Sequence, residues 1–209
     1  MTGPYKTTTI IKGYEIEQTY HEPVFPFDAE RVRSVKIIAF DDEGKILGIK
    51  RGRTFDIPCG QLEWDDDNFQ DTAKREVYEQ ANVNLGQITL AAVIAERIIG
   101  TIEHEQAYEA VAKFRGKQKP EANQKDKKYQ KQRTRPAFTL VMTGGVQEIE
   151  PLPHARDIKR GFFDKETFLD RYRFGNRDDL RKLIEMADFA LPPKSKRENA
   201  IRKAKDKGF

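Results

Sequence analysis

The stretch from Gly60 to Val83 reads GQLEWDDDNFQDTAKREVYEQANV. Its second half places an apolar residue at every fourth position, a set that comprises Phe69, Ala73, Val77 and Ala81. This period predicts a helix over residues 67–81 with a single apolar face. Asp67 and Asn68 are favourable N-cap residues at its start, and Asn82 is suited to its end.

Side chains that carry oxygen lie beside that apolar face. Glu76 and Glu79 are three positions apart, and Gln80 follows Glu76 by four, so all three project from neighbouring points of the predicted helix. In the loop ahead of the helix, Gly60 has no side chain to keep its carbonyl away from a cation. Such a loop facing carboxylates suits a hard cation such as Mg²⁺, which takes few protein carboxylates and keeps waters and phosphate oxygens.

The same stretch resembles the Nudix box. That motif is Gly, five residues, Glu, seven residues, Arg-Glu, an aliphatic residue, any residue, Glu-Glu, any residue, Gly and an aliphatic residue. The chain matches it at Gly60, Arg75, Glu76, Val77, Glu79 and Val83. The resemblance extends over residues 33–191, because Ile57-Pro58 and the Gly161–Asp164 region also look like the family's usual surroundings.

The chain departs from the motif at four points. The spacing from Gly60 to Arg75 is one residue too long, so either Asp66 or Asp67 takes the Glu position. The remaining departures are Cys59 for the first Gly of a common Gly-Gly pair, Asn82 for the last Gly, and Gln80 for the second glutamate of the Glu-Glu pair. A neutral amide oxygen holds Mg²⁺ more weakly than a carboxylate does, so the last departure bears on activity.

The resemblance implies roles for the matching residues. Arg75, Glu76 and Glu79 are expected to be catalytic, with Arg75 pairing with a carboxylate to hold loop and helix together. The expected ligands of Mg²⁺ or Mn²⁺ are the Gly60 carbonyl, Glu76, Glu79 and Gln80. Glu63, Asp66 or Asp67 would add negative charge around the metal without contacting it directly. The general base is open among Glu103, Glu105, Glu148 and Glu150, and no substrate-binding residue is assigned.

The resemblance also implies an activity. We expect a Mg²⁺-dependent pyrophosphohydrolase in which water attacks one phosphorus of a nucleoside diphosphate derivative. The alternative is a Nudix fold that is weakened or inactive as an enzyme and acts as a nucleotide- or RNA-binding module. Nucleoside triphosphates, nucleotide sugars, dinucleoside polyphosphates and capped RNA are all open as substrates.

The fold class implied is α/β, a three-layer α/β/α sandwich with a mixed curved sheet. Residues 1–32 are expected to form an extension with one strand, and residues 33–191 the Nudix domain with a basic insertion at about 115–135. Residues 192–209 form a basic tail. Local patterns predict strands at 14–20, 35–40, 46–49, 55–58, 90–99 and 138–142. They predict helices at 104–114 and around 180–187, and Cys59-Gly60 is expected to break an extended segment.

Charge is distributed unevenly along the chain. Residues 113–136 hold ten Lys or Arg and two acids, and residues 192–209 hold seven and two. These segments carry +8 and +5, so the remaining residues carry −9 of the net +4. An acidic body with basic appendages speaks against assigning nucleic-acid binding to the whole domain. We expect a solvated flexible loop at 115–135 and a frayed tail, with RNA contact through 113–136 and 194–207 as the alternative.

Composition excludes several classes of protein. A single cysteine, Cys59, excludes an internal disulfide framework and a multi-cysteine zinc site. The apolar runs are far shorter than the roughly 20 residues that span a bilayer, and the first residues lack the pattern of a signal peptide. We therefore expect a cytoplasmic protein with no membrane contact, and a homodimer is left open.

Overall fold

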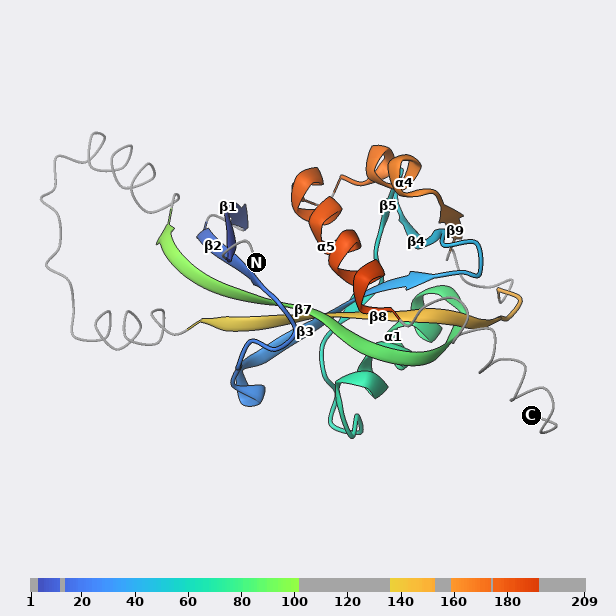
Figure 1. Ribbon diagram of the computed structural model, residues 1–209, viewed down its shortest axis with the longest axis horizontal. Coiled ribbons are helices and arrows are strands. Elements are labelled where there is room, and N and C mark those ends of the chain that lie inside the picture. The colour runs from blue at the N-terminus through green and yellow to red at the C-terminus, as the bar shows by residue number, and fades with distance from the viewer. Residues whose placement is uncertain (1–3, 12–13, 102–135, 153–158, 174, 192–209) are drawn as a thin grey trace, which may run out of the picture.

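The computed structural model describes residues 4–11, 14–101, 136–152, 159–173 and 175–191 (Figure 1). The predicted helix at 104–114, the basic insertion, the basic tail, Glu103 and Glu105 lie outside these ranges. Within them, no helix is both long enough and apolar enough to cross a membrane.

One sheet of nine strands organises the described chain. Its main path runs β1-β2-β7-β8-β3-β4-β5, while β6 pairs with β3 and β9 pairs with β4. The strands are β1 (Tyr5–Ile11), β2 (Tyr14–His21), β3 (Val32–Phe40), β4 (Ile46–Arg51), β5 (Thr54–Asp56), β6 (Cys59–Gly60), β7 (Val83–Thr101), β8 (Ala137–Ile149) and β9 (Arg160–Phe163). The β3–β8 pair is parallel, and the other ladders are antiparallel. Register shifts between β7 and β8 accompany the bend of these long strands, as bulges do.

Helices cover both faces of this sheet. Figure 1 shows α4 (Lys165–Arg171) and α5 (Arg177–Ala190) above it and α1 (Phe69–Ala81) below it. Strand alternation feeds both cores, since Ile37 packs on the α1 side and its neighbour Ile38 on the α5 side. The predicted α/β/α sandwich with a mixed curved sheet is thereby confirmed.

Helix α1 begins and ends as its caps predict. Asn68 accepts hydrogen bonds from the backbone N–H groups of Gln70 and Asp71, so the helix starts at Phe69, two residues later than predicted. At the other end Asn82 adopts a left-handed conformation with φ of 53°. Asn tolerates this region better than most residues, which explains its place where the Nudix motif has Gly.

Several elements differ from the sequence-based predictions. Strand β7 begins at Val83 instead of residue 90, because pairing with both β2 and β8 keeps it extended over its whole length. Cys59-Gly60 does not break the preceding segment, because it pairs with Val35 and Lys36 of β3. Strand β1 and helix α4 were not predicted. Strand β1 has four polar residues in the seven of YKTTTII and is held by its pairing with β2.

Candidate active site

Arg75 fastens the loop after Gly60 to helix α1. Its Nε and Nη2 donate to the two carboxylate oxygens of Asp66 at 3.1 and 2.8 Å. The same guanidinium donates to Glu63 Oε1 at 3.1 Å and to the Gln61 carbonyl at 2.9 Å. Two-pronged pairing of this kind fixes geometry as well as adding energy, so the loop is held rigidly against the helix.

The structure distinguishes between the two aspartates that the motif left open. Asp66 contacts Arg75 and also accepts from the Glu63 N–H and the Thr72 hydroxyl, each at 2.9 Å. Its side chain is 4% exposed, whereas Asp67 is exposed to solvent. The hydrogen bonds from Arg75 hold the pKa of Asp66 far below its usual range. Asp66 is therefore the acid that pairs with Arg75.

Glu76 lies directly against Gly60. A Cβ atom built on Gly60 would stand 1.6 Å from Glu76 Oε1, so no larger residue fits there while this carboxylate keeps its place. The Glu76 side chain is only 10% exposed. Close approach of backbone to a functional group is one of the reasons for which glycine is needed. Gly60 and Glu76 thus form one unit although sixteen positions separate them.

Burial and charge act on Glu76 in opposite directions. Burial raises the pKa of Glu76, and the neighbouring Glu79 raises it further, while Arg75 and the Gln80 amide lower it. Arg75 Nη1 lies 3.1 Å from Glu76 Oε1 and 3.5 Å from Glu79 Oε2, so both carboxylates converge on one cation. Glu79, with 51% of its side chain exposed, faces solvent.

Gln80 bridges the loop and the helix. Its amide nitrogen donates to the Cys59 carbonyl at 2.7 Å and also to Glu76 Oε2, and its oxygen accepts from the Cys59 N–H at 3.4 Å. The reversed amide would set oxygen against oxygen in both donated bonds, so the network fixes this orientation. A glutamate at this position could donate neither bond. The metal role predicted for Gln80 stays a prediction, and the amide oxygen that would ligate a cation faces the Cys59 N–H.

The donor set for a cation is small. Within the described ranges, no three His, Cys, Asp or Glu side chains are grouped so that they could hold a metal on their own. The Glu76 and Glu79 carboxylates form a smaller set beside Gly60, and the predicted role of the Gly60 carbonyl as a ligand stays a prediction. One or two carboxylates, completed by water and substrate phosphate, are what Mg²⁺ ordinarily takes. The residues present therefore fit a single hard cation.

The remaining candidates for the general base lie elsewhere. Glu150 accepts from the Tyr78 hydroxyl at 3.0 Å and from the Asn84 amide at 2.9 Å. At about 100° per residue, Tyr78 lies roughly 160° around the helix from Glu76. Glu148 is exposed and lies within 3.5 Å of the same Asn84 amide. Neither carboxylate has a contact with Glu76 or Glu79 among the hydrogen bonds of the described residues.

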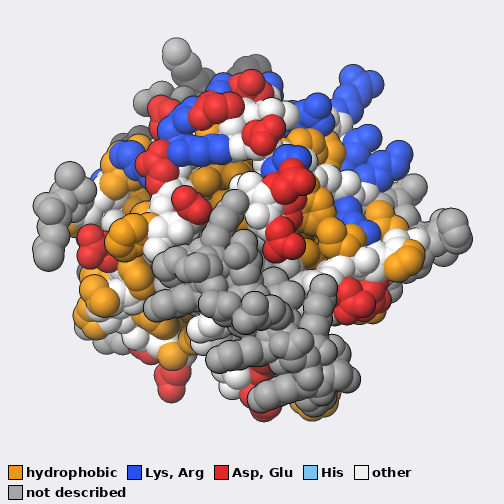
Figure 2. Space-filling view, turned by 45° about the vertical axis from the view of Figure 1, so that its right-hand side comes forward, with side chains coloured by type: hydrophobic (Ala, Val, Ile, Leu, Met, Phe, Trp, Pro, Cys, Tyr) orange, Lys and Arg blue, Asp and Glu red, His pale blue; other side chains and the backbone are white. Residues whose placement is uncertain are grey.

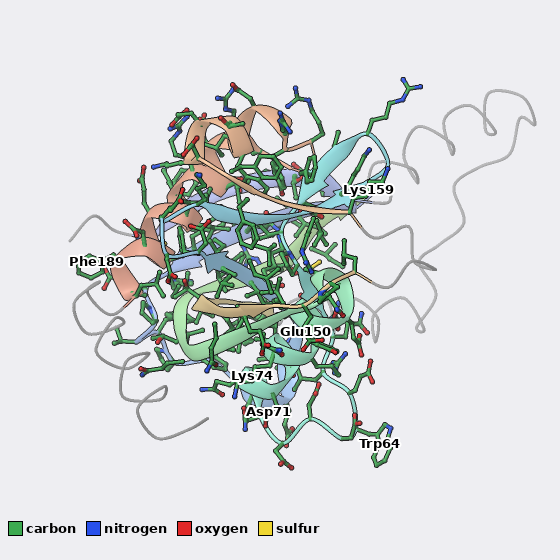
Figure 3. The ribbon with its side chains drawn as sticks, turned by 90° about the vertical axis from the view of Figure 1, so that its right-hand side faces the viewer. Trp64, Asp71, Lys74, Glu150, Lys159 and Phe189 are labelled. Atoms are coloured by element: carbon green, nitrogen blue, oxygen red, sulfur yellow. The ribbon has the colours of Figure 1, made fainter. Side chains whose placement is uncertain are left out.

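Two residues outside the motif shape its surroundings. Arg160 of β9 donates to the carbonyls of Ala81, Asn82 and Glu150, and so caps the C-terminal end of α1. The sequence holds no signal for this contact, because 79 positions separate Arg160 from Ala81. Trp64, in contrast, is 96% exposed at the tip of the loop and projects away from the body (Figure 3).

The chain is similar to known proteins in sequence and in fold. A family model described as NUDIX domain matches residues 30–157, more than half of the chain. No curated protein matches significantly. Among solved structures, a mutant of the Bacillus subtilis pyrophosphohydrolase BsRppH shares 15% identity at a TM-score of 0.47, covering 76% of this chain and 77% of its own. The NUDIX domain of Shewanella oneidensis NrtR, complexed with ADP ribose, shares 13% at 0.47, covering 79% and 94%. The MutT protein of Methanosarcina mazei Go1 shares 15% at 0.43, covering 75% and 92%.

Proposed function

We propose that this chain, which belongs to the Nudix family, is a Mg²⁺- or Mn²⁺-dependent pyrophosphohydrolase that cleaves a diphosphate bond in a nucleoside diphosphate derivative. Residues 33–191 would form its catalytic domain. The site residues are Arg75, Glu76 and Glu79, with the Gly60 carbonyl as a further ligand of the cation.

The placement of Glu76 carries the proposal. A carboxylate that is 10% exposed and lies against a side-chain-free backbone position is costly unless a cation balances it. Arg75 supplies part of that balance and divides its guanidinium among Asp66, Glu63, Glu76 and Glu79. Exposed Glu79 beside Glu76 leaves room for a cation to reach both carboxylates from solvent.

The proposed reaction is hydrolysis of the diphosphate bond by one water molecule. The oxygen of a water molecule forms a bond to one phosphorus and releases a proton to solvent, and the bridging oxygen leaves with the electron pair of the broken P–O bond. A bound Mg²⁺ or Mn²⁺ supplies charge neutralisation on the phosphate oxygens and lowers the pKa of the attacking water. Glu76 and Glu79 hold that charge in place, and Arg75 keeps the Gly60 loop aligned with them.

One observation favours the second candidate function, a binding module without turnover. The Gln80 amide already occupies a lone pair of Glu76, and the position that usually holds a second glutamate adds no negative charge. A nucleotide or RNA would then bind the fold without being hydrolysed. Residues 113–136 and 194–207 would contribute to RNA binding in this reading.

A substrate panel separates the two. Nucleoside triphosphates, nucleotide sugars, dinucleoside polyphosphates and capped RNA are incubated with Mg²⁺ or Mn²⁺ and scored for phosphate, pyrophosphate or nucleoside monophosphate. The proposal expects metal-dependent release from at least one class. Binding to one class by calorimetry with no release from any would identify the binding module instead.

A further inference from the structure

Three segments that are far apart in sequence and rich in Lys and Arg meet at one end of the sheet. Residues 50–55, 159–163 and 171–173 contain Lys50, Arg51, Arg53, Lys159, Arg160, Arg171 and Arg173, and no Asp or Glu. Strand pairing joins the three segments, because β4 pairs with β5 and β9 and because Phe55 bridges to Tyr172. The net charge of −9 outside residues 113–136 and 192–209 does not reveal this cluster, because acidic residues elsewhere outweigh it.

The hairpin between β4 and β5 presents the cluster to solvent. Arg51 pairs with Thr54, so Gly52 and Arg53 form a two-residue loop, and Gly52 supplies the positive φ of 62° that such loops need. Lys50, Arg53 and Lys159 are exposed. Figure 3 shows Lys159 beside this hairpin, and Figure 2 shows Lys and Arg side chains projecting at the upper right.

These cations are free to meet an outside anion. In the described part of the chain, no ion pair links Lys50, Arg53 or Lys159 to a carboxylate. Arg171 stacks on Phe163 with its Cζ 4.9 Å from the ring centre, and Arg173 donates to the Tyr172 carbonyl. Arg160 differs, because its guanidinium is committed to three backbone carbonyls. We define Lys50, Arg53, Lys159, Arg171 and Arg173 as the basic edge.

The basic edge adjoins the candidate active site. Asp56 at the end of β5 is three residues from Cys59, the residue that Gln80 holds. On the other side, Arg160 follows Lys159 and contacts the end of α1. The strands that carry the edge are thus continuous with β6 on one side and in contact with α1 on the other, the two elements that hold Gly60 and Glu76.

The extent of the edge indicates the kind of anion. Three strand spacings from β9 through β4 and β5 to Tyr172 span about 14 Å. That length is more than one phosphate group occupies, so the cations of the edge can contact several phosphates of an extended strand. Phe55 and Phe163 are half-buried, and no aromatic side chain in these three segments is exposed for a base to stack on. The edge is thus suited to phosphates along a strand and not to bases.

We propose that the basic edge binds the phosphate backbone of a single-stranded nucleic acid whose 5′ diphosphate end reaches the site at Gly60 and Glu76. This inference rests on the proposed function for the role of that end, and on the charges of the edge for binding itself. The substrate is then a 5′-phosphorylated strand, recognised without regard to sequence.

The test compares the full chain with two triple variants that lose the same charge. Lys50→Gln, Arg53→Gln and Lys159→Gln neutralise the edge, while Lys6→Gln, Lys45→Gln and Lys165→Gln remove lysines paired with Glu17, Glu43 and Glu185. Fluorescence anisotropy follows labelled single-stranded RNA of about 12 nucleotides, a length typical of strand-binding sites. Added divalent metal is left out, so the result does not depend on hydrolysis, and thermal unfolding verifies that each variant folds.

The edge variant should lower the steepness of the log–log salt dependence by about 2, at roughly 0.7 per lost contact with a single strand. If affinities converge near 1 M salt, this corresponds to about 100-fold weaker binding at 0.1 M. The paired-lysine variant should match the native chain. Equal binding by both variants, or no RNA binding by the native chain at low salt, would overturn the inference. Full displacement of RNA by tripolyphosphate at equal phosphate concentration would also overturn it, since that identifies a short-anion site.

Discussion

At the scale of single residues, the amide of Gln80 stands between the Cys59 backbone and the Glu76 carboxylate. In Gln80→Glu, a carboxylate can donate neither of these bonds and repels Glu76. Without metal, the variant should lose about 1–3 kcal/mol of unfolding free energy, as for an unsatisfied partially buried group. With Mg²⁺ it should gain affinity, because a further carboxylate adds charge at close range.

Thermal unfolding with and without Mg²⁺ measures both effects. The control is Gln147→Glu, an exposed position on β8 that gains the same charge away from the site. A larger rise of Tm on adding Mg²⁺ is expected for Gln80→Glu than for the native chain or the control. An equal response of all three proteins would show that position 80 does not contribute to cation binding.

At the scale of elements, the Arg75–Asp66 pair joins the Gly60 loop to α1. Asp66→Asn should lower the free energy of unfolding by roughly 1.5–3 kcal/mol, the range for hydrogen bonds to charged groups. Asp67→Asn is the matched control, since it removes the same charge one residue away from an exposed side chain, and should change stability by less than about 0.5 kcal/mol. Chemical denaturation measures the free energy of unfolding of the three proteins. Equal destabilisation by Asp66→Asn and Asp67→Asn would contradict the assignment of Asp66.

The pH dependence of that difference follows from the depressed pKa of Asp66. A carboxyl with a lower pKa in the folded state stabilises the protein above its unfolded value, here near 3.8. The stabilisation disappears as pH falls through the lower folded value. The gap between the native chain and Asp66→Asn should therefore be constant at neutral pH and shrink below 3.8. A gap that shrinks well above that pH would contradict the cause given for it.

Local features of the site could be predicted from the sequence, whereas contacts that depend on strand pairing could not. The helix α1 and its caps are local, so the period of Phe69 to Ala81 and the choice of Asn68 and Asn82 identify them. The contacts of Gln80 with Cys59 depend on the β6–β3 pairing, which two residues are too short to signal. The capping of α1 by Arg160 and the basic edge both need β9 to pair with β4, and residue spacing in the chain does not reveal such pairings.

At the scale of the whole molecule, a buried polar cluster fastens the N-terminal hairpin to α5. Asp179 is 7% exposed and accepts from the hydroxyls of Tyr5 on β1 and Tyr20 on β2, at 2.9 and 3.2 Å. The Tyr20 hydroxyl also lies 3.1 Å from Gln18 Oε1 and shares its one proton between these two acceptors, and the Gln18 amide donates to Glu96 of β7. Strands β1 and β2 thus depend on α5 as well as on the sheet.

Asp179→Ala should cost about 2–3 kcal/mol of unfolding free energy, because it leaves two phenol groups without their charged acceptor. Asp178→Ala is matched to it, since both aspartates lie in the first turn of α5 and share its dipole contribution of about 0.3–1 kcal/mol. Hydrogen exchange should show faster exchange in β1 and β2 for Asp179→Ala alone. Equal exchange in both variants would show that Asp179 does not hold the hairpin.

The central claim is that Glu76 and Glu79 support metal-dependent cleavage of a diphosphate. Its most direct measurement is Mg²⁺-dependent phosphate or nucleotide release, on the best substrate of the panel, by Glu79→Gln and by Glu185→Gln. The two glutamates have similarly exposed side chains, 51% and 57%, and Glu185 lies on α5, away from the site. Loss of a group that only supports a metal ligand costs about 10–100-fold in activity, so loss of a ligand in Glu79→Gln should lower activity by at least about 100-fold. Circular dichroism and Tm of this variant should be unchanged, and Glu185→Gln should be fully active. Native turnover by a folded Glu79→Gln would contradict the claim.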